Sequence, residues 1–197
     1  MKPVKVEEAA EAVREGGVAL VSTDTVVGLV ASDAGLARLS VLKERDPAKP
    51  IALLCLSSED AFARARAVPP LARTLAREYW PGPLTLVLDA ADGGTVGVRV
   101  PDTSAMRNLL TVHGEPLHAT SANLSGEPAP RALEAVDDRI RNVVDVILAG
   151  GAGSGEASAV VDLSGGQTRL LRAAGDLTEE KLQSLAVSHL RDPKTDG

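Results

Sequence analysis

The chain has 197 residues, which is enough for one domain with a sizeable core. Apolar residues make up 44% of it and Trp, Tyr and Phe occur once each, so the core must be built from aliphatic side chains. A net charge of −6 excludes a uniformly basic nucleic-acid surface, although a local basic groove is compatible with it. The scarcity of aromatic side chains also argues against a base-stacking platform.

Cysteine and histidine are too few, and too widely spaced, for a metal site of the common kinds. Cys55 is the only cysteine, which excludes an internal disulfide, and the three histidines do not fall at metal-ligand spacing. The N-terminus lacks the apolar segment of a signal peptide, and no apolar run approaches membrane-spanning length. We therefore expect a cytoplasmic protein with no membrane contact and no tightly bound metal or organic cofactor.

Helical and strand patterns alternate along the chain. Amphipathic periodicity and capping residues predict helices over 6–15, 36–44, 70–80, 103–112, 131–136 and 178–189, and a further helix capped by Ser57 or Ser58. Short apolar runs between turn residues predict strands over 18–21, 51–56, 84–88, 96–100, 117–120, 143–148, 159–163 and 168–171. Asp92-Gly93-Gly94 and the Ser-Gly-Gly-Gln run at 164–167 are typical of turns between paired strands.

These elements favour an α/β or α+β fold with a mixed sheet. The two expected hairpins need antiparallel pairs, which makes a purely parallel Rossmann sheet a poor fit. We expect one domain over residues 1–190, followed by a polar tail at 191–197.

Two polar segments in the first quarter could bind a ligand. Residues 22–29 follow a strand with Ser22, Thr23, Asp24 and Thr25, which could present hydroxyl groups and amides to a ligand or form an ordinary capped turn. Residues 43–49 carry three cations where a helix ends. They suit the helix dipole, and they also suit a clamp for a polyphosphate.

Three later segments follow or interrupt strands. Arg99 interrupts an apolar strand and needs a partner if it points inward, such as a bound carboxylate or phosphate. Residues 119–126 place small polar side chains directly after a strand, where ligands of α/β sheets bind. The glycines at 150–155 could let amides approach phosphate or form a flexible loop, and they match neither a Walker A nor a Rossmann motif.

The order of these segments resembles the YrdC-like threonylcarbamoyl-AMP synthase family. The resemblance rests on Thr-Asp-Thr-Val-Val-Gly-Leu (23–29), Lys-Glu-Arg (43–45), Pro-Gly-Pro-Leu-Thr (81–85), Val-Arg-Val-Pro (98–101), Ser-Ala-Asn-Leu-Ser-Gly (121–126), Ser-Ala-Val (158–160) and Leu-Leu-Arg (170–172). It implies a twisted, open mixed sheet flanked by helices, with a large concave cavity. It further implies condensation of L-threonine, bicarbonate and ATP, with Mg²⁺, to threonylcarbamoyl-AMP and pyrophosphate. The product would then pass to a transferase complex that modifies tRNA. The resemblance is to the form without an extra C-terminal domain.

The resemblance also implies roles for particular residues. The catalytic and ATP-handling set would be Lys43, Arg45, Ser121 and Asn123. Further ATP contacts would be Thr95 and Arg172. The threonine contacts would be Thr23, Arg99, Ala119 and Ser158, with Arg99 paired to the substrate carboxylate.

Several positions depart from the family pattern. Ser22 replaces a Pro, Val27 a Tyr, Leu54 a His, Ala129 a Ser and Ala159 a Thr. Most of these changes fall near the expected threonine contacts, which keeps the first of two alternatives open. One is an adenylate-forming relative with another acyl group. The other is a non-catalytic protein that binds RNA or tRNA weakly or assists ribosome maturation.

Overall fold

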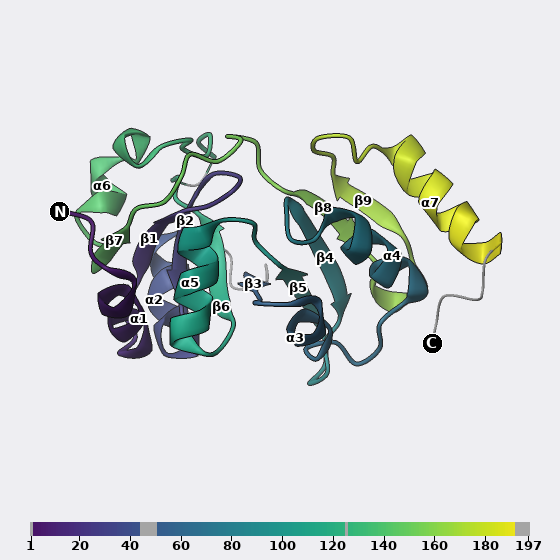
Figure 1. Cartoon of the computed structure of the whole chain (residues 1–197), viewed down its shortest axis with the longest axis horizontal. Coiled ribbons are helices and arrows are strands. Elements are labelled where there is room, and N and C mark those ends of the chain that lie inside the picture. The colour runs from purple at the N-terminus through teal and green to yellow at the C-terminus, as the bar shows by residue number, and fades with distance from the viewer. Residues whose placement is uncertain (1, 44–50, 125, 192–197) are drawn as a thin grey trace.

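A nine-stranded mixed sheet runs through the part of the chain that the structure describes. The computed structural model describes residues 2–43, 51–124 and 126–191. The strand order is β7-β1-β2-β6-β3-β5-β4-β8-β9, with parallel pairs at β1–β7, β3–β5 and β4–β8 (Figure 1). The strands are β1 (Ala19–Ser22), β2 (Val27–Ala31), β3 (Ala52–Leu54), β4 (Leu84–Asp89), β5 (Thr95–Arg99), β6 (Leu117–Ser121), β7 (Val146–Leu148), β8 (Ala159–Asp162) and β9 (Arg169–Arg172).

Helices pack against the two halves of this sheet in different ways (Figure 1). The α-helices are α1 (Val6–Arg14), α2 (Leu36–Leu42), α3 (Ser58–Phe62), α4 (Pro70–Tyr79), α5 (Ser104–His113), α6 (Asp138–Arg141) and α7 (Glu179–Arg191). Around β1 and β2, α1 and α5 pack on one face, and α2 and α6 on the other. Around β4 and β8, α3, α4 and α7 cover the face that carries Leu84, Leu86 and Leu88.

The opposite face of β4 and β5 holds the smaller of two cavities. Side chains alternate along a strand, so Thr85 and Val87 point away from the leucines of β4. Together with Gly97 and Arg99 of β5, they line a cavity of about 300 Å³. This half of the sheet therefore has a core on one face and a ligand-sized space on the other.

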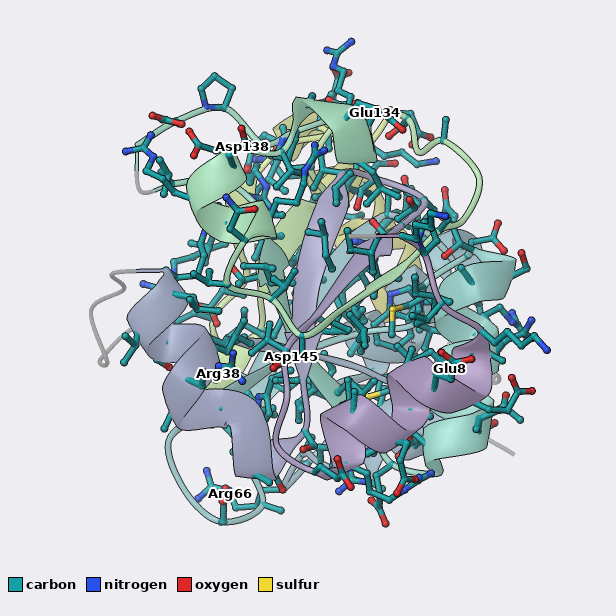
Figure 2. The ribbon with its side chains drawn as sticks, turned by 90° about the vertical axis from the view of Figure 1, so that its left-hand side faces the viewer. Glu8, Arg38, Arg66, Glu134, Asp138 and Asp145 are labelled. Carbon is teal, nitrogen blue, oxygen red and sulfur yellow. The ribbon has the colours of Figure 1, made fainter. Side chains whose placement is uncertain are left out.

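An ion pair fixes the direction of α2, which ends next to Lys43. Arg38 donates from Nη1 to the Asp145 carboxylate, at 2.8 Å from Oδ2, and the same Oδ2 accepts from the Val18 amide at 2.8 Å. Figure 2 shows Arg38 of α2 beside Asp145, which precedes β7. Buried Leu39 packs α2 on the β1–β2 face. These contacts aim the C-terminal end of α2 at the loop after β6.

The predicted fold class is confirmed, as are both hairpins. β4 and β5 pair antiparallel, as do β8 and β9. The predicted helix over 131–136 is only a 3₁₀ turn, Leu133–Ala135. Two elements were missed. β2 was hidden because a polar turn precedes it and Gly28 interrupts its apolar pattern; α6 has only four residues. The predicted strand over 143–148 was too long, since only Val146–Leu148 pairs.

Within the described ranges, no helix is long and apolar enough to cross a membrane.

Cys55 should be chemically inert in the native protein. It is fully buried, and burial, reinforced by nearby Asp60, raises the pKa of its thiol to about 12. Since the thiolate is the reactive form, we expect no reaction with Ellman's reagent at mildly alkaline pH until the protein is unfolded. Colour development on the time scale of mixing with native protein would contradict this.

Candidate functional site

The turn between β1 and β2 holds its hydroxyl groups in a fixed arrangement. The Thr23 hydroxyl donates to the Val26 carbonyl at 2.6 Å and accepts from the Thr25 amide at 3.2 Å. The Thr23 and Thr25 hydroxyl oxygens are 3.0 Å apart, and both side chains are buried. The predicted polar turn is thus a rigid one, and both threonines line the 300 Å³ cavity.

The glycine-rich segment at 150–155 packs on the back of this turn. The Ser154 amide donates to the Asp24 carbonyl at 2.9 Å, and the Gly155 amide donates to the Thr25 carbonyl at 2.7 Å. A Cβ atom at Gly153 would meet the Thr23 carbonyl oxygen and lie 2.5 Å from that of Thr25. The amides of Ser154 and Gly155 are therefore used within the protein, and this part of the segment supports the turn. Glycine is needed for close approach to the turn.

Gly153→Ala should therefore lower stability and disturb the turn. The new methyl group would press on two backbone carbonyls that cannot rotate away, and overpacking of this kind costs about 1–3 kcal/mol. Gly151→Ala is the matched control, because a Cβ there has nothing within 4 Å. Urea denaturation of both variants measures the difference. Equal midpoints would show that the loop does not brace the turn.

Arg99 lies at the end of β5 and already has a carboxylate partner. Its Nη2 donates to Asp24 Oδ2 at 2.5 Å, its Nη1 to the Thr25 hydroxyl at 3.0 Å and its Nε to the Gly82 carbonyl at 3.0 Å. The two charged side chains are only 8% and 13% exposed. Burial lowers the pKa of Arg99, and Asp24 opposes that shift. The interruption of the strand by Arg99 is thus explained by Asp24, and a ligand is not required to explain it.

Arg172 and Ser158 meet on the other side of the cavity. Arg172 donates from Nε to the Ser158 carbonyl at 2.6 Å, and the Ser158 hydroxyl is 3.0 Å from that of Thr85. The pKa of Arg172 is lowered first by burial and then by the positive charge of Arg99. Asp24 pairs with Arg99, and no carboxylate among the described residues pairs with Arg172, so the two guanidinium groups leave excess positive charge that favours an anionic ligand in this cavity.

Lys43 is buried against the loop that follows β6. Its ammonium group donates to the Ser121 carbonyl at 2.8 Å, to Asn123 Oδ1 at 3.0 Å and to the Asn123 carbonyl. The Ser121 hydroxyl donates to the same Oδ1 at 2.5 Å, and the Asn123 amide donates to the carbonyls of Leu124 and Glu127. Asn123 therefore shapes its own loop and holds Lys43, in addition to any contact with a ligand.

The structure brings most of the predicted site residues together. The members that line the 300 Å³ cavity are Thr23, Arg99, Ala119, Ser121, Ser158 and Arg172. Lys43 and Asn123 join them through Ser121. Thr95 does not line the 300 Å³ cavity. It is exposed at the start of β5 and lines a second, larger cavity. Arg45 lies outside the described residues.

Sequence reasoning missed three residues of the site. Asp24 and Thr25 were seen only as parts of a polar turn, and Thr85 only as the last residue of the Pro-Gly-Pro-Leu-Thr motif. For Thr85, the sequence contained a usable pattern. Thr85 and Val87 alternate with the buried leucines of β4, and this alternation places Thr85 on the face of the strand that borders the cavity.

The departures from the family pattern fall in different places. Leu54 lines the cavity, next to Arg99 in the β3–β5 register. Ala159 instead packs in the core beneath α4 and α7, and Val27 packs in the core beneath α2. Of these three, only Leu54 changes the surface of the cavity directly.

Comparison with known proteins gives one consistent family. The family model for Sua5, YciO and YrdC proteins, described as "Telomere recombination", matches residues 11–174. Threonylcarbamoyl-AMP synthase of Chromohalobacter salexigens is 35% identical over 178 residues, covering 83% of this chain and 95% of that protein. The enzyme of the same name from Pyrococcus abyssi is 34% identical over 189 residues, covering 89% of this chain.

Solved structures agree. P. abyssi Sua5 complexed with L-threonine superposes with a TM-score of 0.83 at 30% identity, covering 93% of this chain and 58% of that one. Escherichia coli YciO superposes with a TM-score of 0.76 at 26% identity, covering 87% and 90%. The chain spans 56% of the P. abyssi relative and 60% of the mouse relative.

Proposed function

Because this chain belongs to the Sua5/YciO/YrdC family, we propose that it is an L-threonylcarbamoyladenylate synthase. In this proposal it condenses L-threonine, bicarbonate and ATP to threonylcarbamoyl-AMP and pyrophosphate. The relatives that carry this name, and the relative that was solved with L-threonine, support the choice of reaction and of amino acid.

The observation that carries the proposal is the cluster of cations around one cavity. Arg99 and Arg172 border a space of about 300 Å³, and Lys43 is tied to its wall through Ser121. Such a cavity favours anions, and the proposed reaction brings together the carboxylate of an amino acid, bicarbonate and the phosphates of ATP.

The chemistry would depend on positioning and charge neutralisation. Threonine's amine condenses with bicarbonate, with loss of water, to give an N-carboxylate, whose oxygen attacks the α-phosphorus of ATP as pyrophosphate leaves. The protein needs no covalent nucleophile for this, and Cys55 is fully buried. Lys43, Arg45 and Arg172 would stabilise the negative charge on the phosphates, and Ser121 and Asn123 would orient the nucleotide. Thr23, Arg99, Ala119 and Ser158 would bind the amino acid. Thr95, the remaining predicted nucleotide contact, borders the larger cavity and is not part of this set.

Mg²⁺ would enter with ATP. This ion binds through phosphate oxygens and water together with one or two protein oxygens. The hydroxyls of Thr25 and Ser158 line the cavity. The neighbouring Asp24 carboxylate does not line it, but its buried Oδ1 has no hydrogen-bond partner among the described residues, so this oxygen also suits the ion. The ion would supply further neutralisation of the phosphate charge.

The product would serve a tRNA threonylcarbamoyl transferase. An adenylate of this kind is an activated acyl group, so the next reaction must be its transfer to an acceptor. In this proposal the acceptor is an adenosine of tRNA in a partner complex, and the protein acts in the cytoplasm.

Mass spectrometry of the reaction product tests the proposal. Purified protein with ATP, Mg²⁺ and bicarbonate should release pyrophosphate and form threonylcarbamoyl-AMP only when L-threonine is added. Formation of carbamoyl-AMP without threonine would point to a related adenylate-forming activity. Salt-sensitive RNA binding without consumption of ATP would overturn the enzymatic proposal.

A further inference from the structure

A second cavity lies on the other side of the strands that border the proposed active site. It measures about 970 Å³ and is the one that Thr95 borders. Leu53 of β3 and His118 of β6 point into it and lie opposite each other in the register. Their neighbours Ala52, Leu54 and Ala119 line the 300 Å³ cavity instead. The two cavities are therefore back to back across β3 and β6.

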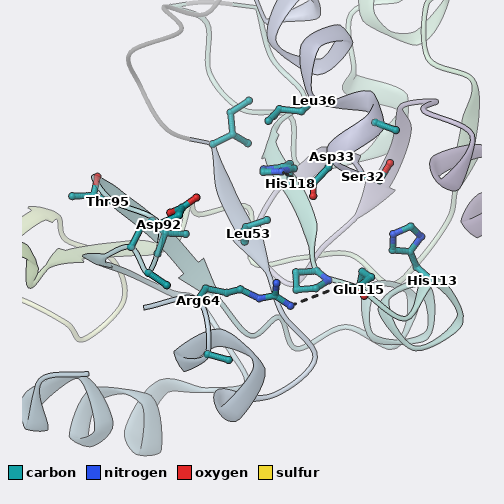
Figure 3. A pocket seen from close by; sticks show the side chains of 18 of the residues that line it. Ser32, Asp33, Leu36, Leu53, Arg64, Asp92, Thr95, His113, Glu115 and His118 are labelled. Carbon is teal, nitrogen blue, oxygen red and sulfur yellow. Dashed lines mark hydrogen bonds and ion pairs between the residues drawn. The ribbon is translucent and has the colours of Figure 1, made fainter. Parts of the chain in front are cut away.

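The charges of the larger cavity do not favour an anion. Its guanidinium groups already face carboxylates: Arg14 is 2.6 Å from Glu11, and Arg64 is 3.1 Å from Asp60 and 3.8 Å from Glu115. Three carboxylates line the cavity against two guanidinium groups. In Figure 3, the contact between Arg64 and Glu115 spans the lower side of the cavity. Among the described residues that line this cavity, both guanidinium groups already have a counter-charge, so a phosphate group would gain little from either.

The floor suits a flat, partly apolar ring. Leu36, Ile51 and Leu53 supply aliphatic surface. The imidazole of His118 stands beside Leu53 and is held by Asp33, with 2.7 Å between Nε2 and Oδ1. Figure 3 shows Leu53 between His118 of β6 and Arg64, which follows α3. Planar side chains over an aliphatic floor are typical of sites for aromatic rings.

The rim of the larger cavity carries carboxylates that can accept hydrogen bonds. The side chains of Asp33 and Glu115 are 98% and 72% exposed, and Asp92 is exposed on the β4–β5 hairpin. Carboxylates accept hydrogen bonds from hydroxyl and amino groups and repel phosphate. From this geometry we propose that the 970 Å³ cavity binds an uncharged nucleoside, with the base on the Leu53 floor and the sugar hydroxyls at the acidic rim.

Calorimetric titration with adenosine tests this site. Wild-type protein should bind adenosine, and AMP should bind there about tenfold more weakly or worse, because its phosphate faces the rim carboxylates. Leu53→Arg should weaken adenosine binding by about tenfold or more by occupying the floor. Ala91→Trp places a large side chain at the exposed rim and should also weaken adenosine binding. This second variant provides the test if Leu53→Arg does not fold.

A variant of the other cavity separates the two sites. Arg172→Ala should leave adenosine affinity unchanged, since Arg172 lines only the 300 Å³ cavity of the two. Circular dichroism would confirm that each variant is folded. The proposal is overturned if adenosine does not bind at millimolar concentration, if binding survives in folded Ala91→Trp protein, or if Arg172→Ala removes it.

Discussion

Lys43→Ala should reduce ATP-dependent pyrophosphate release by about 100-fold, the loss typical when one charge-stabilising donor is removed from an active site. Lys43 is 7% exposed, so its ammonium group is held in place by the Ser121 and Asn123 oxygens. Removing it also leaves buried acceptors without a donor, which costs about 1–3 kcal/mol of stability. A cation that served only the dipole of α2 would contribute about 0.3–1 kcal/mol and no activity.

Two further variants separate charge from packing. Lys43→Met keeps the aliphatic stem and removes the ammonium group, so we expect stability nearer to wild type and the same loss of turnover. Lys181→Ala removes a lysine of α7 whose partner is Glu78 at 2.8 Å, and it should leave turnover unchanged. Pyrophosphate release at saturating substrates and urea midpoints give the two readouts. Turnover near wild type in folded Lys43→Met protein would remove Lys43 from the proposed phosphate clamp.

The local sequence pattern predicted much of the fold, because short apolar runs indicate buried strands and capping residues indicate the starts of helices. Ser57 illustrates this: it accepts from the Asp60 amide and begins α3 where a cap was expected. The strand order could not be predicted in the same way. β3 lies between β5 and β6, and β8 lies next to β4, so the order depends on pairing between segments far apart in the sequence.

The site residues also divide into those that local sequence could predict and those that depend on contacts between distant segments. Ser121, the last residue of β6, was found because ligands bind at the ends of strands, whereas Ser158, which precedes β8, was found only through the family resemblance. The partner of Arg99 was not found, because Asp24 is 75 residues away along the chain. Thr95 shares the strand of Arg99 but lies four residues earlier, which at 3.3 Å per residue is roughly 13 Å away. Spacing along one strand therefore did not reveal which cavity Thr95 borders.

Asp24→Ala should destabilise the protein by about 3–5 kcal/mol, the typical cost of leaving one member of a buried ion pair alone. The Arg99 guanidinium would keep its contacts with Gly82 and Thr25 but lose the only carboxylate within salt-bridge distance among the described residues. Asp24→Asn should cost less, because the amide oxygen can still accept from Nη2. Urea denaturation of the two variants gives the comparison.

The double variant Asp24→Ala, Arg99→Met distinguishes a structural role from a functional one. Removing both charges should recover most of the lost stability, since replacing a whole buried pair by apolar groups is often close to neutral. If Arg99 also binds the amino-acid carboxylate, the stable double variant should still lack threonine-dependent pyrophosphate release. Recovery of turnover together with stability would show that the pair only supports the turn at 23–25. Arg172 would then be the arginine at this cavity left to bind the carboxylate.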